Sequence, residues 1–316
     1  MENKILIALG GNAIVGPGEE GNLEQQYRHT GETMAELATL LHESHFDGLI
    51  LSHGNGPQVG NILLRSEYAS EVIYPITLDV AVADSQAGMG YMIQQSLHNA
   101  LARVGEQRLV TTVITQVEVR RDDPAFANPT KFIGQSFPHK KVETLVRDRK
   151  WQMKLDRGRG WRRVVASPEP RVILEQDIIR RLLQEGVIVI AVGGGGIPVV
   201  READGRLHGV EAVIDKDMAS ALLAKNLGLK TFIIVTGVEQ VCVGFGTPQQ
   251  RPLGRVTTDE ARKYLDAGEF PEGSMGPKIR AALLFLEGGG EEVIITRPGK
   301  LRAAIGGNAG TKIVRG

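Results

Sequence analysis

The chain has 316 residues, 42% of them hydrophobic, which is enough for a sizeable core in one large α/β unit. Its 37 basic and 37 acidic residues cancel, so the net charge creates no field that would attract nucleic acid or a membrane surface. A single cysteine, Cys242, excludes an intramolecular disulfide, and its alternating surroundings predict a buried strand residue. We find neither a signal sequence nor an apolar run long enough to span a bilayer, and we expect a cytoplasmic protein.

Apolar runs typical of strands alternate with segments of helical periodicity along the chain. In the first half, strands are predicted at 5–9, 49–52 and 109–115, and helices at about 23–41, 58–64 and 79–104. In the second half, strands are predicted at 187–192, 231–235 and 293–296, and helices at 173–184, 218–227 and 278–286. This alternation predicts an α/β fold, a three-layer α/β/α sandwich with a mostly parallel central sheet and helices on both faces.

Two segments interrupt the alternation. Residues 201–209, with Asp204-Gly205 at their centre, predict a surface hairpin. Residues 120–163 contain both tryptophans, and their part from His139 to Arg163 carries ten Lys or Arg against three Asp or Glu. We interpret 120–163 as an excursion inserted within a single domain that spans 1–316. Basic grooves with aromatic residues can bind single strands, but such charge runs are usually solvated faces, so we expect no nucleic-acid partner.

Three glycine-rich turns each follow a predicted strand. They are Gly10-Gly11-Asn12-Ala13, Gly54-Asn55-Gly56-Pro57 and the four glycines 193–196. Glycine lets the backbone approach a ligand closely, so its N–H groups can converge on the oxygens of an anion, and a helix that follows adds its positive dipole end. The spacing does not fit the dinucleotide fingerprint, because Gly60 comes one residue late after Gly54-Asn55-Gly56. It does not fit a P-loop either, because no Gly-Lys-Ser or Gly-Lys-Thr occurs. The turns therefore predict a phosphate site at the carboxyl ends of the strands.

Two lysines downstream strengthen this prediction. Lys216 lies between Asp215 and Asp217, and Lys278 follows Gly276-Pro277. A lysine supplies a flexible positive charge that can follow phosphoryl oxygens, and the aspartates could orient it or hold a hydrated magnesium ion. A lone lysine is usually only a solvated surface charge, so the prediction that these lysines bind phosphate depends on the glycine turns in the same chain.

Together with Asn128-Pro129-Thr130-Lys131, these motifs resemble those of the carbamate kinases of the amino-acid kinase superfamily, in the same order and over nearly the whole chain. The resemblance implies reversible phosphoryl transfer between ATP and carbamate, in practice often in the direction that forms ATP from carbamoyl phosphate. It also implies a homodimer, and a small protruding subdomain, here 120–163, that closes over the active site. The carbamoyl phosphate would come from arginine or purine catabolism.

The same resemblance assigns roles to individual residues. Carbamate and the transferring group would bind to Gly10, Gly11, Asn12, Gly54, Asn55 and Gly56. The catalytic group would consist of Lys131, Lys216 and Lys278, organised by Asp215. The nucleotide would contact Gly194, Gly195, Asp217, Thr236 and Met275. We expect Mg²⁺ held mainly by nucleotide phosphates and water, with no dedicated metal ligands in the protein.

Three points remain open at this stage. His53 could act as a general base, but the attacking oxygen is already anionic, so we expect a structural hydrogen bond that shapes the turn. Gly237 and Cys242 stand where many carbamate kinases have an acidic residue and a tyrosine, which puts the adenine contacts in question. The alternatives are a related kinase with another small acid acceptor, opposed by Ala8-Leu9 where acetylglutamate kinases have a lysine, or a weakly catalytic sensor of carbamoyl phosphate or nucleotide.

Overall fold

The computed structural model describes residues 3–16, 18–44, 46–156 and 160–316, apart from the side chain of Asn12. An eight-stranded sheet forms its centre, in the order β15-β17-β16-β12-β1-β2-β9-β3. The strands, in that order, are Arg255–Thr257, Thr311–Val314, Glu292–Thr296, Thr231–Val235, Lys4–Leu9, Gly48–His53, Ile188–Ile190 and Val110–Thr112. Neighbouring strands are parallel apart from the antiparallel pair β16 and β17. The predicted mostly parallel α/β sheet is confirmed.

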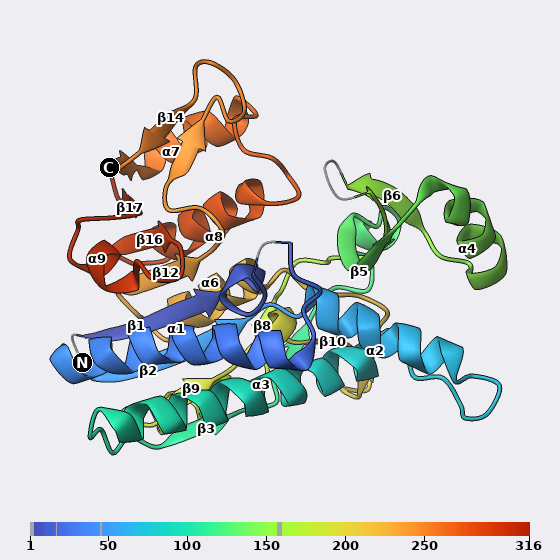
Figure 1. The fold of residues 1–316 in the computed structure, drawn as a ribbon, viewed down its shortest axis with the longest axis horizontal. Coiled ribbons are helices and arrows are strands. Elements are labelled where there is room, and N and C mark those ends of the chain that lie inside the picture. The colour runs from blue at the N-terminus through green and yellow to red at the C-terminus, as the bar shows by residue number, and fades with distance from the viewer. Residues whose placement is uncertain (1–2, 17, 45, 157–159) are drawn as a thin grey trace.

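Helices cover both faces of this sheet (Figure 1). One face packs against α1 (Leu23–Glu43), α3 (Leu78–Arg103) and α9 (Leu301–Ile305). The other packs against α5 (Gln176–Gln184), α6 (Lys216–Asn226), α7 (Thr258–Asp266) and α8 (Met275–Glu287). A further helix, α2 (Gly56–Tyr68), follows β2. Helix α5 begins later than predicted because residues 172–173 form the short strand β8 (Val172–Ile173).

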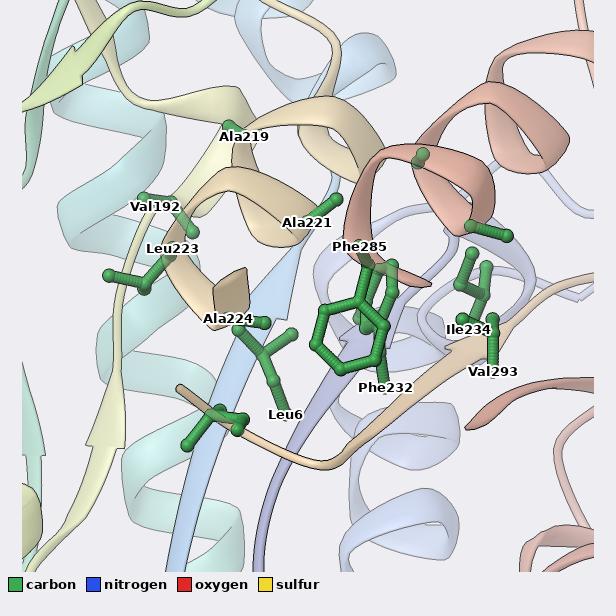
Figure 2. Packing of buried hydrophobic residues seen from close by; sticks show 14 of the residues in the cluster. Leu6, Val192, Ala219, Ala221, Leu223, Ala224, Phe232, Ile234, Phe285 and Val293 are labelled. Carbon is green, nitrogen blue, oxygen red and sulfur yellow. The ribbon is translucent and has the colours of Figure 1, made fainter. Parts of the chain in front are cut away.

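The core around the main sheet consists of two layers because side chains of a strand alternate between the faces of a sheet. In β1, Leu6 and Ala8 point into the layer of α6 and α8, whereas Ile5, Ile7 and Leu9 point into the layer of α1 and α3. Figure 2 shows the first layer, where Leu6 lies near Phe232 and Phe285. The rings of Phe232 and Phe285 meet edge to face with centroids 5.7 Å apart. A central strand buried on both faces explains its continuous apolar sequence.

Smaller sheets surround the main one. The order β11-β10-β4-β8 joins Leu207–Gly209, Ile197–Arg201, Gln116–Glu118 and Val172–Ile173. The antiparallel pair β10 and β11 confirms the predicted hairpin. The strands β13 (Val241–Val243) and β14 (Arg251–Leu253) also pair. Cys242 in β13 is partly exposed, which corrects the prediction of a buried residue: its neighbours Val241 and Val243 occupy the core face, so the alternate side chain points away.

A three-stranded sheet lies apart from the others, on the flank of α2 (Figure 1). Its order is β5-β7-β6, and its strands are Lys131–Phe137, Gly160–Val165 and Met153–Asp156. The connection from β5 to β6 carries η3 (His139–Lys141) and α4 (Val142–Arg149). We call the described residues from 131 to 165 the protruding subdomain. Residues 116–118 and η2 (Pro124–Phe126) precede this sheet, and none of the helices in the described ranges is long and apolar enough to cross a membrane.

Candidate functional site

The turns that follow β12, β1, β2 and β9 lie side by side because these four strands are neighbours in the sheet. The Gly10 N–H donates to the Val235 carbonyl at 2.8 Å, and the Gly54 N–H donates to the Leu9 carbonyl at 3.1 Å. These bonds extend the pairing of the parallel strands by one residue. A Cβ at Gly10 would lie 2.5 Å from the Val235 oxygen, so only glycine fits there.

These hydrogen bonds correct part of the predicted anion site. The N–H groups of Gly10 and Gly54 already have carbonyl partners, so they do not point at a ligand. Gly11 and Gly56 are the first residues of η1 (Gly11–Ala13) and α2, where helical N–H groups have no acceptor within the helix. Of the four glycine amides predicted to bind an anion, those of Gly11 and Gly56 are therefore the ones that can do so. The Asn12 side chain, predicted to bind substrate, lies outside the described part.

Asn55 is buried, and the turn 193–196 packs against it. Its Nδ2 donates to Ser85 Oγ at 2.8 Å. A Cβ at Gly194 would lie 2.2 Å from Asn55 Nδ2, and Gly194 has a φ of +65°, so glycine is required on both counts. Gly194 was predicted to contact the nucleotide, but it lies against a residue of the predicted carbamate turn.

Ser85 and Gln86 of α3 hold two of the glycine turns, and the sequence reasoning missed both. Gln86 donates through Nε2 to the Gly193 carbonyl at 3.0 Å and accepts from the Thr115 N–H at 2.6 Å. Both side chains are buried in the apolar stripe of α3, between Val82 and Met89. Buried polar side chains need partners, so two polar residues within an apolar helical stripe were the signal that could have identified them.

The first turn of α6 brings the predicted catalytic residues together. Asp215 caps the helix: its Oδ1 accepts from the N–H groups of Asp217 and Met218 at 2.9 Å and 3.3 Å. Its Oδ2 accepts from Lys131 Nζ at 2.6 Å, so the protruding subdomain reaches the end of α6. The positive end of the α6 dipole lies at this place.

Asp217 holds the other two lysines. Its Oδ1 accepts from Lys216 Nζ at 2.7 Å, and its Oδ2 accepts from Lys278 Nζ at 2.9 Å. The Asp217 side chain is only 3% exposed, and those of Lys216 and Lys278 are 10% and 14% exposed. The predicted division of roles changes accordingly, because Asp217, predicted to contact the nucleotide, organises two lysines and Asp215 organises only Lys131. Methylenes of Lys216 lie against Gly54, with Cδ and Cε 3.8 Å from where a Cβ would stand.

Burial and charge determine the protonation states of this cluster. Burial alone would raise the pKa of Asp217, but the charges of Lys216 and Lys278 and their hydrogen bonds outweigh it and hold the pKa far below its usual range. Burial lowers the pKa of Lys216, and Asp217 partly offsets this. For Lys278 burial acts in the same direction, yet the contact with Asp217 raises the pKa overall. Three ammonium groups and two carboxylates leave one net positive charge beside the glycine turns.

His53 is fully buried at the end of β2. Burial is the main reason that its pKa falls to about 4, and the nearby charge of Lys216 lowers it further. Its Nδ1 lies 3.2 Å from the Gly54 carbonyl, and its Nε2 has no partner among the described residues. The imidazole is therefore neutral near pH 7 and contacts the turn, as predicted.

The remaining residues predicted to bind nucleotide lie in three places. Thr236 follows β12 and donates its N–H to the Thr296 carbonyl at 2.7 Å, and Met275 begins α8, one turn before Lys278. Gly195 instead packs against the Ile214 carbonyl, which a Cβ would approach to 2.3 Å.

Among the described residues, no three His, Cys, Asp or Glu side chains gather as metal ligands. Both oxygens of Asp215 and of Asp217 already accept hydrogen bonds. The cluster is therefore suited to bind the oxygens of phosphoryl groups, with any divalent ion brought by those groups.

Comparisons with known proteins agree with this chemistry. The model of the Amino acid kinase family matches residues 3–297. The carbamate kinase-like protein YahI of Escherichia coli K12 is 48% identical over the full length of both chains. The carbamate kinase of Pyrococcus furiosus is 43% identical, covering 99% of this chain and all of the relative.

A solved carbamate kinase from Giardia lamblia bound to AMP-PNP superposes with a TM-score of 0.90 at 37% identity, covering 100% of this chain and 99% of that one. Another structure of the Giardia enzyme, bound to citric acid, gives a TM-score of 0.94 at 36% identity, with the same coverage. The chain thus belongs to the amino acid kinase family, among its carbamate kinases.

Proposed function

We propose that this protein is an ATP:carbamate phosphotransferase that works chiefly from carbamoyl phosphate and ADP to ATP and carbamate. The observation that supports this most directly is the cluster of Lys131, Lys216 and Lys278 on two aspartates at the N-terminus of α6. Such a cluster stabilises the negative charge that spreads over the phosphoryl oxygens during transfer.

The glycine turns would position the small substrate. The N–H groups of Gly11 and Gly56 begin η1 and α2, and Asn55 is fixed by Ser85 between them and the turn 193–196. Carbamate carries its own negative charge, so the reaction requires no proton acceptor. The buried His53, with its pKa near 4, is largely unprotonated at neutral pH, and its Nδ1 lies against the Gly54 carbonyl. Catalysis then consists of alignment and charge stabilisation.

A nucleotide-bound Mg²⁺ would fit this site, because the site supplies cations and amides for phosphate oxygens. The ion would neutralise charge on the β- and γ-phosphates when bound. Lys278 and Met275 in the first turn of α8, together with Thr236, would line the nucleotide side.

A coupled assay of ATP formation from carbamoyl phosphate, ADP and Mg²⁺ tests the proposal. Lys216→Ala should fold yet lose on the order of 10²-fold in turnover, the effect of removing one preorganised donor from such a site. Lys225→Ala, on the exposed side of the same helix, is the matched control and should retain turnover. Full turnover of Lys216→Ala would remove that lysine from the chemistry. Acetylglutamate and uridylate as acceptors test the related-kinase alternative, and tight ADP binding without turnover would indicate a sensor.

We further propose a homodimer and a cytoplasmic enzyme that serves arginine or purine catabolism. Strand β3 forms one edge of the main sheet. The exposed Leu109 and Ile114 flank this strand in the chain, and the exposed Tyr91 lies on α3. An apolar sheet edge of this kind favours pairing with a second copy. Sedimentation velocity measures the oligomeric state, and fractionation of the native cells measures the location.

A further inference from the structure

One carboxylate of α2 accepts three hydrogen bonds from the protruding subdomain. Glu67, in the last turn of α2, accepts hydrogen bonds from Arg149 at 3.2 Å, from Trp151 Nε1 at 3.1 Å and from Arg163 at 3.0 Å. The three donors come from the end of α4, from the residues before β6 and from β7. They lie 82 to 96 residues from Glu67 in the chain and meet on its side chain, so this carboxylate is a polar contact that fixes the subdomain on α2, beside the apolar contacts of Val59 and Leu63 with Ile133 and Val165.

The surroundings of Glu67 make this contact rigid. The Arg163 guanidinium lies over the Trp151 ring, 4.9 Å from its centroid, and the Phe137 ring meets Trp151 edge to face at 5.7 Å. Trp151 is only 6% exposed. A planar guanidinium that both pairs with a carboxylate and stacks on an aromatic ring keeps one orientation.

Helix α2 connects this contact to the reaction site. Its other end is the turn of Asn55 and Gly56, roughly 16 Å away at the helical rise per residue. Along its flank, Gly60 approaches Gly134 of β5 so closely that a Cβ would lie 2.0 Å from the Gly134 Cα. Near its start, the Phe132 carbonyl lies 3.9 Å from where a Cβ of Gly56 would stand. The first strand of the subdomain therefore follows α2 from the Glu67 contact back to the substrate turn.

The packing of β5 along α2 determines the position of Lys131. It begins β5, beside Phe132, and its Nζ reaches the cap of α6. Its pairing with Asp215 cannot by itself hold the subdomain, because Lys131 is 31% exposed and ion pairs of that kind are weak. Lys131 would also turn toward phosphoryl oxygens during transfer, whereas the Glu67 contact requires no substrate.

We propose that Glu67 is a positioning residue, which holds the protruding subdomain on α2 and thereby keeps Lys131 over the transferring phosphoryl group. This inference rests on the proposed function for its catalytic part. Its structural part, the anchoring of the subdomain by Glu67, stands without it.

Glu67→Gln is the primary variant, because the amide keeps the shape and loses the charge that two arginines face. We expect kcat for ATP formation to fall about tenfold or more, since small displacements of a reacting group have effects of this size, while KM for ADP changes little. Glu67→Asp keeps the charge with a shorter reach and should lie between wild type and Glu67→Gln. Glu287→Gln, which breaks an ion pair with Arg262 at the far end of α8, is the matched control and should keep full kcat.

Two further readouts separate positioning from a general structural effect. In a Lys131→Ala background, Glu67→Gln should cause no further loss of kcat, because its effect passes through that lysine. Both tryptophans of the chain lie in the protruding subdomain. With Trp161→Phe, the emission of the remaining Trp151 should shift to longer wavelength when Glu67→Gln releases the ring to water.

The outcomes are distinct. Unchanged kcat and unchanged emission in Glu67→Gln would overturn the inference, and so would an equal loss of kcat with and without Lys131. If Glu67→Gln does not fold, the same measurements on Glu67→Asp decide. If the wild type forms no ATP, the proposed function fails, and the Trp151 emission alone then decides whether Glu67 anchors the subdomain.

Discussion

Replacement of Asp217 by asparagine tests the electrostatic centre of the site. The carboxylate accepts from Lys216 and Lys278, and the three side chains are 3%, 10% and 14% exposed. The neutral amide would leave two buried ammonium groups with only Asp215 as a nearby anion. Removal of one partner from a buried ion pair costs about 3–5 kcal/mol. The unfolding entropy of a 316-residue chain is about 0.66 kcal/mol per kelvin, so this cost corresponds to a fall in Tm of about 5–8 °C.

The same variant should lose activity in a pH-dependent manner. Burial already lowers the pKa of Lys216, and Asp217 is the main group that opposes this. Without the carboxylate the pKa of Lys216 falls further, and the lysine becomes neutral as the pH rises through that lower value. Because only the ammonium form stabilises phosphoryl oxygens, the residual kcat of Asp217→Asn should be higher at acid than at alkaline pH, after correction for the wild-type profile.

Differential scanning calorimetry and the ATP-forming assay measure both effects. Asp204→Asn is the matched control: that aspartate pairs with Arg206 in the exposed hairpin, where ion pairs contribute little, so its Tm should stay close to that of the wild type. A Tm of Asp217→Asn within one degree of wild type, or a residual kcat independent of pH, would refute the reasoning that this carboxylate keeps two buried lysines charged.

Three other predictions concern the glycine turns, the subdomain lysine and the buried histidine. Lys131→Ala should lower kcat by on the order of 10²-fold, and the Tm should change little because the ion pair of Lys131 is partly exposed. Steady-state kinetics and calorimetry on one preparation test this, and a large fall in Tm with normal kcat would contradict it. Gly10→Ala should lower the free energy of unfolding in urea by about 1–3 kcal/mol, because the new Cβ would meet the Val235 oxygen at 2.5 Å. Gly11→Ala, with nothing within 4 Å of the new Cβ, should lower it far less, and equal losses would show that the contact is relieved without strain. His53 has a folded-state pKa of about 4 and an ordinary pKa of 6.5, so its contribution to stability is complete above about pH 6.5 and is lost as the pH falls toward 4, by about 3 kcal/mol. The free energy of unfolding should therefore fall more steeply with decreasing pH in the wild type than in His53→Gln, and an equal pH dependence in both would count against a buried neutral ring.

Much of this protein could be predicted from local patterns. Apolar runs and helical periodicity identified six strands of the main sheet, because burial on both faces of a parallel sheet leaves a recognisable sequence, whereas β15, β17, α7 and α9 were not predicted. The turns at Gly10, Gly54 and Gly193 were predicted at strand ends and are found there. Lys216 and Lys278 were predicted to meet, and they share Asp217.

Other features depended on contacts between distant residues. The N–H groups of Gly10 and Gly54 were predicted to face a ligand, but strand pairing extends one residue further and occupies them. Gln86 escaped notice because its partners are distant in the chain: Gly193 lies in the turn after β9 and Thr115 in the loop between β3 and β4. Glu67 stands on a helix surface where a charged residue is ordinary, and only its three partners distinguish it.

The sequence by itself determined the kinds of element, the glycine turns that follow the strands and the residue types able to bind phosphate, since these depend on period, composition and backbone freedom. Only the tertiary structure decided which turns became neighbours, which carboxylate holds which lysine and where the subdomain is anchored. Those outcomes depend on the order of strands in the sheet and on the rotation of each helix about its axis, which are set by packing over the whole molecule.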